Sequence, residues 1–170
     1  MVILFSGRKS RTEKEIIEIL TKQGATYISD KFVAENQGLF TIISTYKKTE
    51  INLNKGIAVF IDDTERFNEQ TFPIGIIGIC EDNNIKALET FKKSGIAVIS
   101  CGINLKNTIT LSSINDDELL ASLQRTVIDN CGNQIDPSEF KIKLTKSFSP
   151  FAIMASVAVL LLNGIVPTEF

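Results

Sequence analysis

Short apolar runs alternate with amphipathic segments over the first hundred residues of the chain. Apolar side chains recur at helical spacing in residues 13–23 and 84–93, so we predict two helices there, ending at Gly24 and Gly95. Five apolar runs of strand length lie around these helices, at residues 2–5, 39–44, 56–61, 74–80 and 96–100. Because these runs are apolar throughout, the pattern indicates a parallel sheet that helices cover on both faces.

The pattern changes after residue 107. Residues 108–113, 120–128 and 140–144 are β-branched or alternating, which predicts three further strands. The sequence NCGN at 130–133 separates the last two in the way a hairpin turn does. We therefore expect one α/β domain over residues 1–170, with a mostly parallel sheet, flanking helices and a β-rich antiparallel addition at the sheet edge.

The segment 151–166 carries no charged residue and contains the polar residues Ser156 and Asn163. A helix that spans a membrane needs about 20 apolar residues, so we expect a buried core helix here, and a tail anchor is the alternative. The first residues do not have the pattern of a signal peptide. These features predict a cytoplasmic protein without a membrane partner.

The composition excludes several classes of chemistry. Hydrophobic residues make up 44% and charged residues 22%, which is typical of a globular chain. The net charge of −2 does not indicate a strongly basic protein, so we expect no nucleic-acid partner. The chain has no histidine, which rules out Ser-His-Asp and Cys-His catalysis and His-ligated zinc. The three cysteines, Cys80, Cys101 and Cys131, are far apart, and we expect buried reduced thiols.

A polar turn, SGRKSRT at residues 6–12, joins the first strand to the first helix. Its candidate anion-binding residues are Gly7, Lys9, Ser10 and Thr12. A helix N-terminus attracts anions, and Arg8 and Arg11 would add positive charge to Lys9. In the alternative interpretation, the hydroxyl of Ser10 or Thr12 only caps the helix.

Two acidic pairs directly follow predicted strands. Asp62 and Asp63 could bind a metal ion or a magnesium-bound phosphate, or could be a solvated strand end with a capping role. Glu81 and Asp82 have the same metal-binding interpretation, and the alternative is a cap for the helix that begins near Asn84. Convergence of both pairs with Lys9 would favour a cation site, but the spacing alone does not show it. We expect no resident metal.

Three stretches, in order, resemble the central ATP-binding domain of the Mur ligases, the enzymes that add amino acids to peptidoglycan precursors. Residues 2–24 have the layout of a strand, a Gly-containing turn, Lys, Ser and a helix. Residues 76–114 resemble a strand that ends in acidic residues, a helix and the following strands, and residues 141–170 resemble an Ala-rich helix. Together the stretches cover most of the chain, and the resemblance implies an α/β fold and a bacterial origin.

The chain departs from the family at the residues that carry the chemistry. The family's P-loop reads G-x-x-G-K-[ST]-[ST], on which Gly7, Lys9 and Ser10 can be placed, but this turn is shorter and lacks a Gly before Lys9. Ile42 stands where the family has a magnesium-binding Glu, and the family's magnesium-binding His has no counterpart. The family's Asn- and His-containing turn is replaced by SFSP at 147–150. The family's substrate domain and amino-acid-binding domain do not fit within 170 residues.

The resemblance and its departures predict a pseudoenzyme, a non-catalytic module with a degenerate P-loop that acts through an unknown protein partner or as a homo-oligomer. We expect no cofactor and no ATP-dependent ligation. The alternative is a small nucleotide- or phosphate-binding protein that uses the turn 7–12 with ATP and magnesium, and that has at most weak phosphohydrolase activity.

Overall fold

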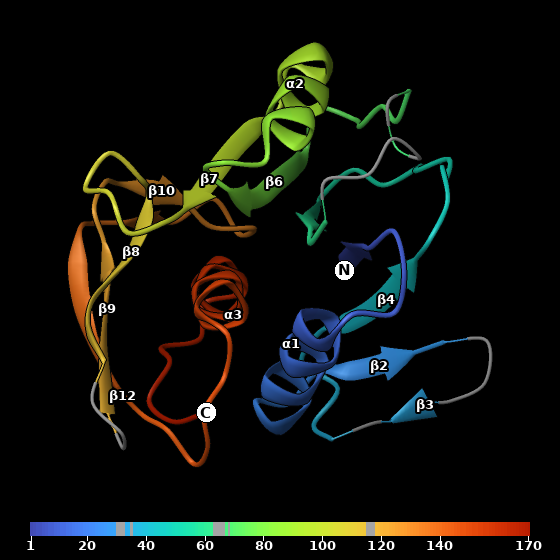
Figure 1. Cartoon of the computed structure of the whole chain (residues 1–170). Coiled ribbons are helices and arrows are strands. Elements are labelled where there is room, and N and C mark those ends of the chain that lie inside the picture. Colours follow the sequence, from blue (N-terminus) through green and yellow to red (C-terminus); the bar gives the residue numbers. More distant parts are fainter. Residues whose placement is uncertain (30–32, 35, 63–66, 68, 115–117) are drawn as a thin grey trace.

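A computed structural model describes residues 1–29, 33–34, 36–62, 67, 69–114 and 118–170 (Figure 1). Within these residues, ten strands form one sheet in the order β12-β9-β8-β7-β6-β5-β1-β4-β2-β3, and β10 pairs with β11 separately. The strands of the first half are β1 (Val2–Phe5), β2 (Thr26–Ile28), β3 (Val33–Ala34), β4 (Thr41–Thr45), β5 (Gly56–Phe60) and β6 (Ile76–Glu81). Those of the second half are β7 (Ala97–Cys101), β8 (Ile109–Ile114), β9 (Glu118–Leu123), β10 (Val127–Ile128), β11 (Gln134–Ile135) and β12 (Ser138–Lys143). The helices are α1 (Arg11–Lys22), α2 (Ile85–Ser94) and α3 (Pro150–Leu162).

Seven neighbouring strands of this sheet pair in parallel, in the order β8-β7-β6-β5-β1-β4-β2. At the edges, β3 pairs antiparallel with β2, β9 with β8, and β12 with β9. The mostly parallel sheet and its antiparallel addition confirm the predicted fold class. In the register of the central strands, Phe5 lies opposite Thr45 on one side and Phe60 on the other. The residues that follow β1, β4 and β5 therefore emerge at the same edge of the sheet, where parallel α/β sheets bind ligands.

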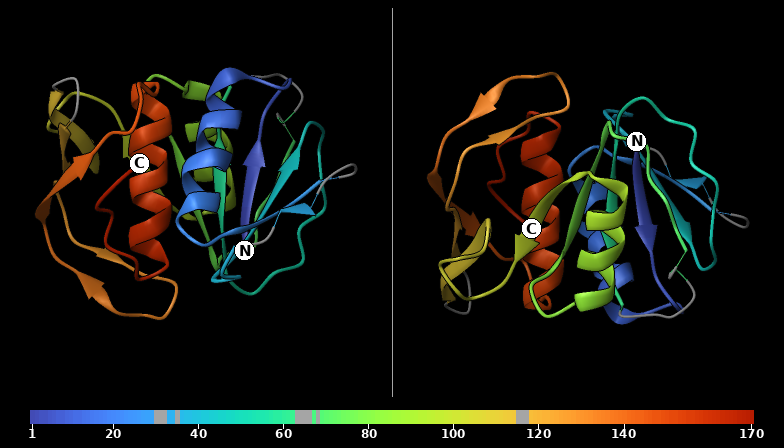
Figure 2. Two further views of the ribbon diagram at one scale, coloured as in Figure 1. Left: turned by 90° about the horizontal axis from the view of Figure 1, so that it is seen from below. Right: turned by 90° about the horizontal axis from the view of Figure 1, so that it is seen from above.

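Helices cover both faces of the sheet, as the apolar strands predicted. The amphipathic helix α1 lies beside α3 on one face, and α2 covers the other face (Figure 2). Beneath α2, five buried phenylalanine rings pack against one another at centroid distances from 4.8 to 6.1 Å: Phe5, Phe60, Phe67, Phe72 and Phe91. Two apolar layers, one on each face, thus hold the sheet in place.

The strands β8, β9 and β12 curve around α3 (Figures 1 and 2). Every residue of α3 from Phe151 to Leu162 is buried, which confirms the predicted core helix and explains why its sequence lacks a polar face. No helix in the described part of the chain is long and apolar enough to cross a membrane.

The start of α3 is capped by a residue of α1. Ser149 is the N-cap of α3, but its side chain makes no capping bond within the helix. Instead, the Ser149 backbone N–H and hydroxyl donate to Glu15 Oε2 at 2.9 and 2.6 Å. Arg11 holds the other carboxylate oxygen, with Nε 2.7 Å from Oε1. A carboxylate at a helix N-terminus also interacts favourably with the helix dipole. This contact therefore holds the N-terminus of α3 against the side of α1.

Three details differ from the sequence predictions. The predicted strand 120–128 is broken, because β9 ends at Leu123 and β10 leaves the main sheet to pair with β11. The turn 130–133 consequently connects β10 to β11, and Asp129 Oδ1 accepts hydrogen bonds from the Cys131 and Asn133 amides inside it. Cys131 is exposed there, so the prediction of three buried thiols was wrong for this residue, although Cys80 and Cys101 are buried.

Candidate functional site

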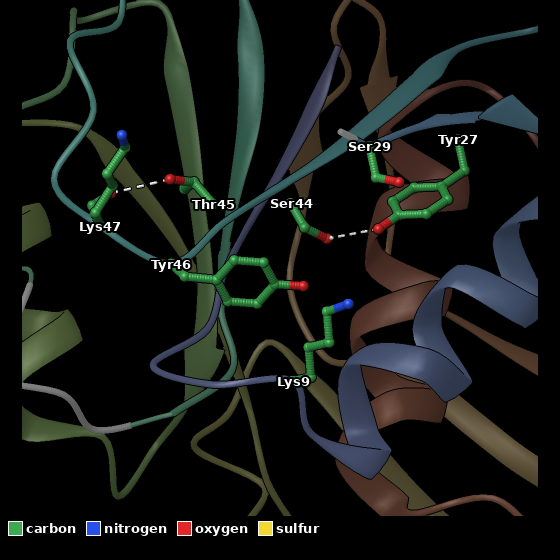
Figure 3. A pocket seen from close by; sticks show the side chains of 7 residues that line it. All are labelled: Lys9, Tyr27, Ser29, Ser44, Thr45, Tyr46 and Lys47. Atoms are coloured by element: carbon green, nitrogen blue, oxygen red, sulfur yellow. Dashed lines mark hydrogen bonds between the residues drawn. The ribbon is translucent and has the colours of Figure 1, made fainter. Parts of the chain in front are cut away.

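A cleft of about 350 Å³ opens where the carboxyl ends of β1, β2 and β4 meet the start of α1. Its lining residues are Lys9, Tyr27, Ser29, Ser44, Thr45, Tyr46 and Lys47 (Figure 3). A second hollow of about 270 Å³ lies along α1, and it shares Lys9, Tyr27 and Tyr46 with the cleft. The parallel register of β2, β4 and β1 brings the lining segments to one edge of the sheet.

Lys9 points into this cleft, between the rings of Tyr27 and Tyr46 (Figure 3). It is exposed, and it has no ion-pair partner among the described residues. On the opposite wall, the Tyr27 hydroxyl lies 3.4 Å from Ser44 Oγ. Of the predicted anion-binding residues, Lys9 is thus the one whose charge is available to a ligand in the cleft.

The Gly7 amide of the predicted anion turn is hydrogen-bonded within the protein. The backbone N–H of Gly7 donates to Asp62 Oδ2 at 3.2 Å, and Ser6 Oγ lies 2.9 Å from the same oxygen. The Ser6 hydroxyl also contacts the carbonyl oxygen of Arg8. A carboxylate that follows β5 therefore occupies the Gly7 amide, which is a donor that an anion at this turn would use.

Ser10 is the N-cap of α1, and its Oγ accepts a hydrogen bond from the Glu13 amide at 3.1 Å. This is the capping role that the alternative interpretation gave to the turn. Thr12 lies one residue inside α1 and is half-buried. Neither residue lines the cleft or the hollow beside it.

Glu13, in the first turn of α1, is a buried residue of the candidate site that the sequence analysis did not single out. Its side chain is 1% exposed and lines the hollow beside Lys9. Its Oε1 accepts a hydrogen bond from the Tyr46 hydroxyl at 2.7 Å, whereas Oε2 has no partner among the described residues. Burial and the neighbouring Glu13 carboxylate raise the pKa of the Tyr46 phenol, so Tyr46 stays protonated and donates.

The described members of the two acidic pairs bind different parts of the protein. The Asp62 carboxylate accepts hydrogen bonds from Ser6 and Gly7 in the turn, and Asp63 lies outside the described residues. At the end of β6, burial and the neighbouring Asp82 raise the pKa of Glu81, and Asp82 Oδ2 accepts from Asn107 Nδ2 at 2.7 Å. The N-cap of α2 is Asn84, whose Oδ1 accepts from the Ala87 amide at 3.0 Å, so the alternative that gave the capping role to Glu81 and Asp82 was wrong.

No group of three or more acidic or cysteine side chains in the described part of the chain could hold a metal ion. Ile42, which the resemblance placed at the position of the family's magnesium-binding Glu, is fully buried in β4. The described carboxylates therefore do not form the cation site that convergence with Lys9 would have made.

Comparison with known proteins shows a fold and no sequence family. No protein-family model and no curated protein matches the sequence. A structure similar to this chain is UDP-N-acetylmuramate:L-alanyl-gamma-D-glutamyl-meso-diaminopimelate ligase from Neisseria meningitides, with a TM-score of 0.62 and 11% sequence identity. The match covers 99% of this chain and 62% of that chain, so this chain spans less than two thirds of that protein. The fold resembles that of a Mur ligase domain.

Proposed function

We propose that this chain is a non-catalytic module with a Mur-ligase-like fold, and that it acts by binding protein partners. The observation that carries the proposal is the contact of the Asp62 carboxylate with the Gly7 amide and the Ser6 hydroxyl. In a working P-loop, backbone amides at this position cradle phosphate oxygens. A phosphate that approached the turn here would meet a negative charge in place of a free donor.

The residues that the resemblance assigns to metal binding are also replaced in this sequence. Magnesium neutralises the charge that develops in phosphoryl transfer, and acidic or histidine side chains hold it there. Ile42 occupies the expected glutamate position, and the chain has no histidine. The similar structure is named a ligase, and we propose that the present chain does not share the ligation activity.

The loop after β7 supports a role in partner binding. Ile103 and Leu105 in this loop are 85% and 74% exposed. The loop is nevertheless braced, because Asn107 donates to Asp82 and Arg125 Nη2 donates to the Lys106 carbonyl at 2.6 Å. A hydrogen-bonded loop that presents large apolar side chains to solvent is typical of a protein-binding surface.

The alternative, a small nucleotide- or phosphate-binding protein, is favoured by one observation. Lys9 reaches into the cleft without an ion-pair partner among the described residues. An anion bound there would lie on the β4 side of β1, away from the turn amide that Asp62 occupies.

Thermal-shift titrations with ATP, ADP and inorganic phosphate, each with and without magnesium, test the proposal. We expect no change in Tm of the wild-type protein with any of them. A ligand that binds only the folded state at 100 times its Kd would add about 2.7 kcal/mol of stability, which corresponds to several degrees in a domain of this size.

The variant Asp62→Asn is the matched comparison, because it removes the charge and keeps the size of the side chain. A phosphate-dependent rise in Tm for this variant alone would support closure of the turn by Asp62. A magnesium-dependent rise with ATP in the wild type would contradict the proposal and establish the nucleotide-binding alternative.

A further inference from the structure

The sheet is interrupted where β7 meets β8. A single bridge joins the last residue of β7, Cys101, to the first residue of β8, Ile109. The strand β8 therefore runs on beyond β7 rather than beside it, and it curves around α3 (Figure 1). Among the described strands, none pairs with β7 on this side from Ala97 to Ile99. The sheet thus has a gap next to the first part of β7.

A groove of about 370 Å³ lies at this gap. Its aliphatic lining comes from β6, β7, β10 and the end of α3, through Ile77, Ala97, Ile99, Val127, Ile128 and Leu162. Ile128 is 52% exposed, although it is a large apolar side chain. A groove of this size and lining is typical of a site for an apolar ligand, because binding removes the exposed aliphatic surface from water.

Two charged residues, Arg125 and Asp129, line the groove at opposite ends of β10. The Asp129 carboxylate is already satisfied, because it accepts hydrogen bonds from the Cys131 and Asn133 amides and from Asn133 Nδ2. Arg125 donates from Nη2 to the Lys106 carbonyl oxygen at 2.6 Å, and it has no ion-pair partner within the described residues. A guanidinium group has several N–H donors, so Arg125 offers a positive charge and further donors to a ligand.

Thr108 lies next to this end of the groove, because its carbonyl oxygen accepts from the amide of Gln124, the neighbour of Arg125, at 2.8 Å. Thr108 is 5% exposed and also lines the groove. Its backbone N–H donates to Ser100, whereas its hydroxyl is not hydrogen-bonded to any residue that the structure describes. A buried hydroxyl without a partner is unfavourable, and a carboxylate is a strong acceptor for both a hydroxyl and a guanidinium group.

We propose that this groove binds a straight-chain fatty acid, with its carboxylate on Arg125 and the Thr108 hydroxyl and its hydrocarbon chain along the aliphatic lining. A neutral or cationic head group would leave the charge of Arg125 unpaired, so the carboxylate distinguishes this ligand from other apolar molecules. The groove shares no lining residue with the cleft at Lys9. The inference therefore goes beyond the proposed function and does not depend on it.

The test is isothermal titration calorimetry with the series of n-alkanoates from butanoate to dodecanoate, each below its critical micelle concentration. We expect one molecule to bind per chain. The affinity should rise by about fourfold for each added methylene, which is the effect of burying that group, and should level off once the groove is filled. The n-alkanols and n-alkylamines of the same length lack the carboxylate, and both should bind at least tenfold more weakly.

Two variants locate the head group and the chain. Arg125→Gln removes an exposed cation, so we expect it to fold, to lose at least tenfold in affinity for the alkanoate and to bind the alkanol like the wild type. Ile128→Ser should weaken the alkanoate and the alkanol by the same factor, because it removes aliphatic lining. Lys93→Gln, which changes an exposed residue of α2 on the other face of the sheet, is the control and should bind like the wild type.

Far-UV circular dichroism and the Tm without ligand would show that the variants are folded. Several results would overturn the inference: no alkanoate binds, the affinity does not depend on chain length, the alkanol binds as tightly as the alkanoate, or Arg125→Gln retains full affinity. These outcomes are separate from the nucleotide titrations. The proposed function fails if ATP with magnesium binds, whereas this inference fails if the alkanoates do not.

Discussion

Gly78 in β6 shows how closely single residues determine the packing beneath α2. A Cβ atom placed on Gly78 would lie 2.7 Å from two ring carbons of Phe91. Phe91 is itself fully buried among the other phenylalanine rings, so it has little room to move. The strand therefore needs a residue without a side chain at this position.

We expect Gly78→Ala to destabilise the protein by about 1–3 kcal/mol, because an added methyl group in a packed core forces its neighbours apart. This loss corresponds to a fall in Tm of roughly 2–12 °C for a chain of this length. The double variant Gly78→Ala with Phe91→Leu should lose less than the sum of the two single variants, since leucine makes room for the methyl group. Additive losses would contradict the close contact.

At the same scale, the sequence predicted which residues form the turn but not all of their hydrogen-bond partners. It offered helix capping as one role of Ser10, which the structure shows, and it placed Lys9 in the candidate site. It could not reveal that Asp62 occupies the Gly7 amide, because the two residues are 55 positions apart and only the pairing of β1 with β5 brings them together. The role of Thr12 stays a prediction.

At the scale of elements, the stability contributed by the contact between Glu15 and the start of α3 depends on pH. Burial raises the pKa of Glu15, but the hydrogen bonds from Ser149 and Arg11 outweigh it, and the net effect lowers the pKa from its ordinary value of 4.5. The stabilisation from this contact is therefore fully present above about pH 4.5 and is lost as the pH falls through the lower, folded-state pKa.

We expect Glu15→Gln to lower the free energy of unfolding by about 1–3 kcal/mol at pH 7, because hydrogen bonds to a charged group are replaced by weaker ones. Urea unfolding at pH 7 and at pH 3 should show that the difference from the wild type becomes smaller in acid. The exposed Glu89 of α2 provides the control, and Glu89→Gln should change stability by less than about 0.5 kcal/mol. An equal effect of Glu15→Gln at both pH values would contradict the assigned role.

Most elements could be predicted because their apolar residues form continuous runs or recur at helical spacing. The runs that became β1, β5, β6 and β7 and the spacing of α1 and α2 are of this kind. In contrast, β2 and β3 contain three and two residues, too few to show an alternation. The break between β9 and β10 has no Gly or Pro to mark it, so it depends on tertiary contacts such as the bond from the Gln124 amide to the Thr108 carbonyl.

At the scale of the whole molecule, the fold could be predicted from the sequence, whereas the cleft could not. The order of three resembling stretches predicted a fold that the structure comparison supports at 11% identity. The cleft depends on Tyr27, Ser44 and Tyr46, which meet only because β2 and β4 pair in parallel with Tyr27 opposite Ile42. No local motif marks these three residues, so only the three-dimensional structure identifies them as a site.

The exposed loop after β7 leads to a prediction about assembly. We expect the double variant Ile103→Ser with Leu105→Ser to fold with an unchanged Tm, because both side chains are largely exposed. It should lose partner binding or self-association, since burial of two large apolar side chains contributes several kcal/mol to an interface.

Light scattering combined with size-exclusion chromatography would show whether the wild type self-associates and whether the variant does not. If the wild type is monomeric, cross-linking with a partner and equilibrium binding would compare the two forms. A partner that binds both forms equally would show that this loop is not the interface.

The contact between Glu15 and Ser149 also governs when the molecule can complete its fold during synthesis. The two residues are 134 positions apart, and a ribosome adds about 5–20 residues per second. The apolar side of α1, with Ile16, Ile19 and Leu20, is therefore made roughly 7–27 s before the helix that covers it exists. For that period the nascent chain depends on chaperones or on transient contacts to keep its first helix from associating with other chains.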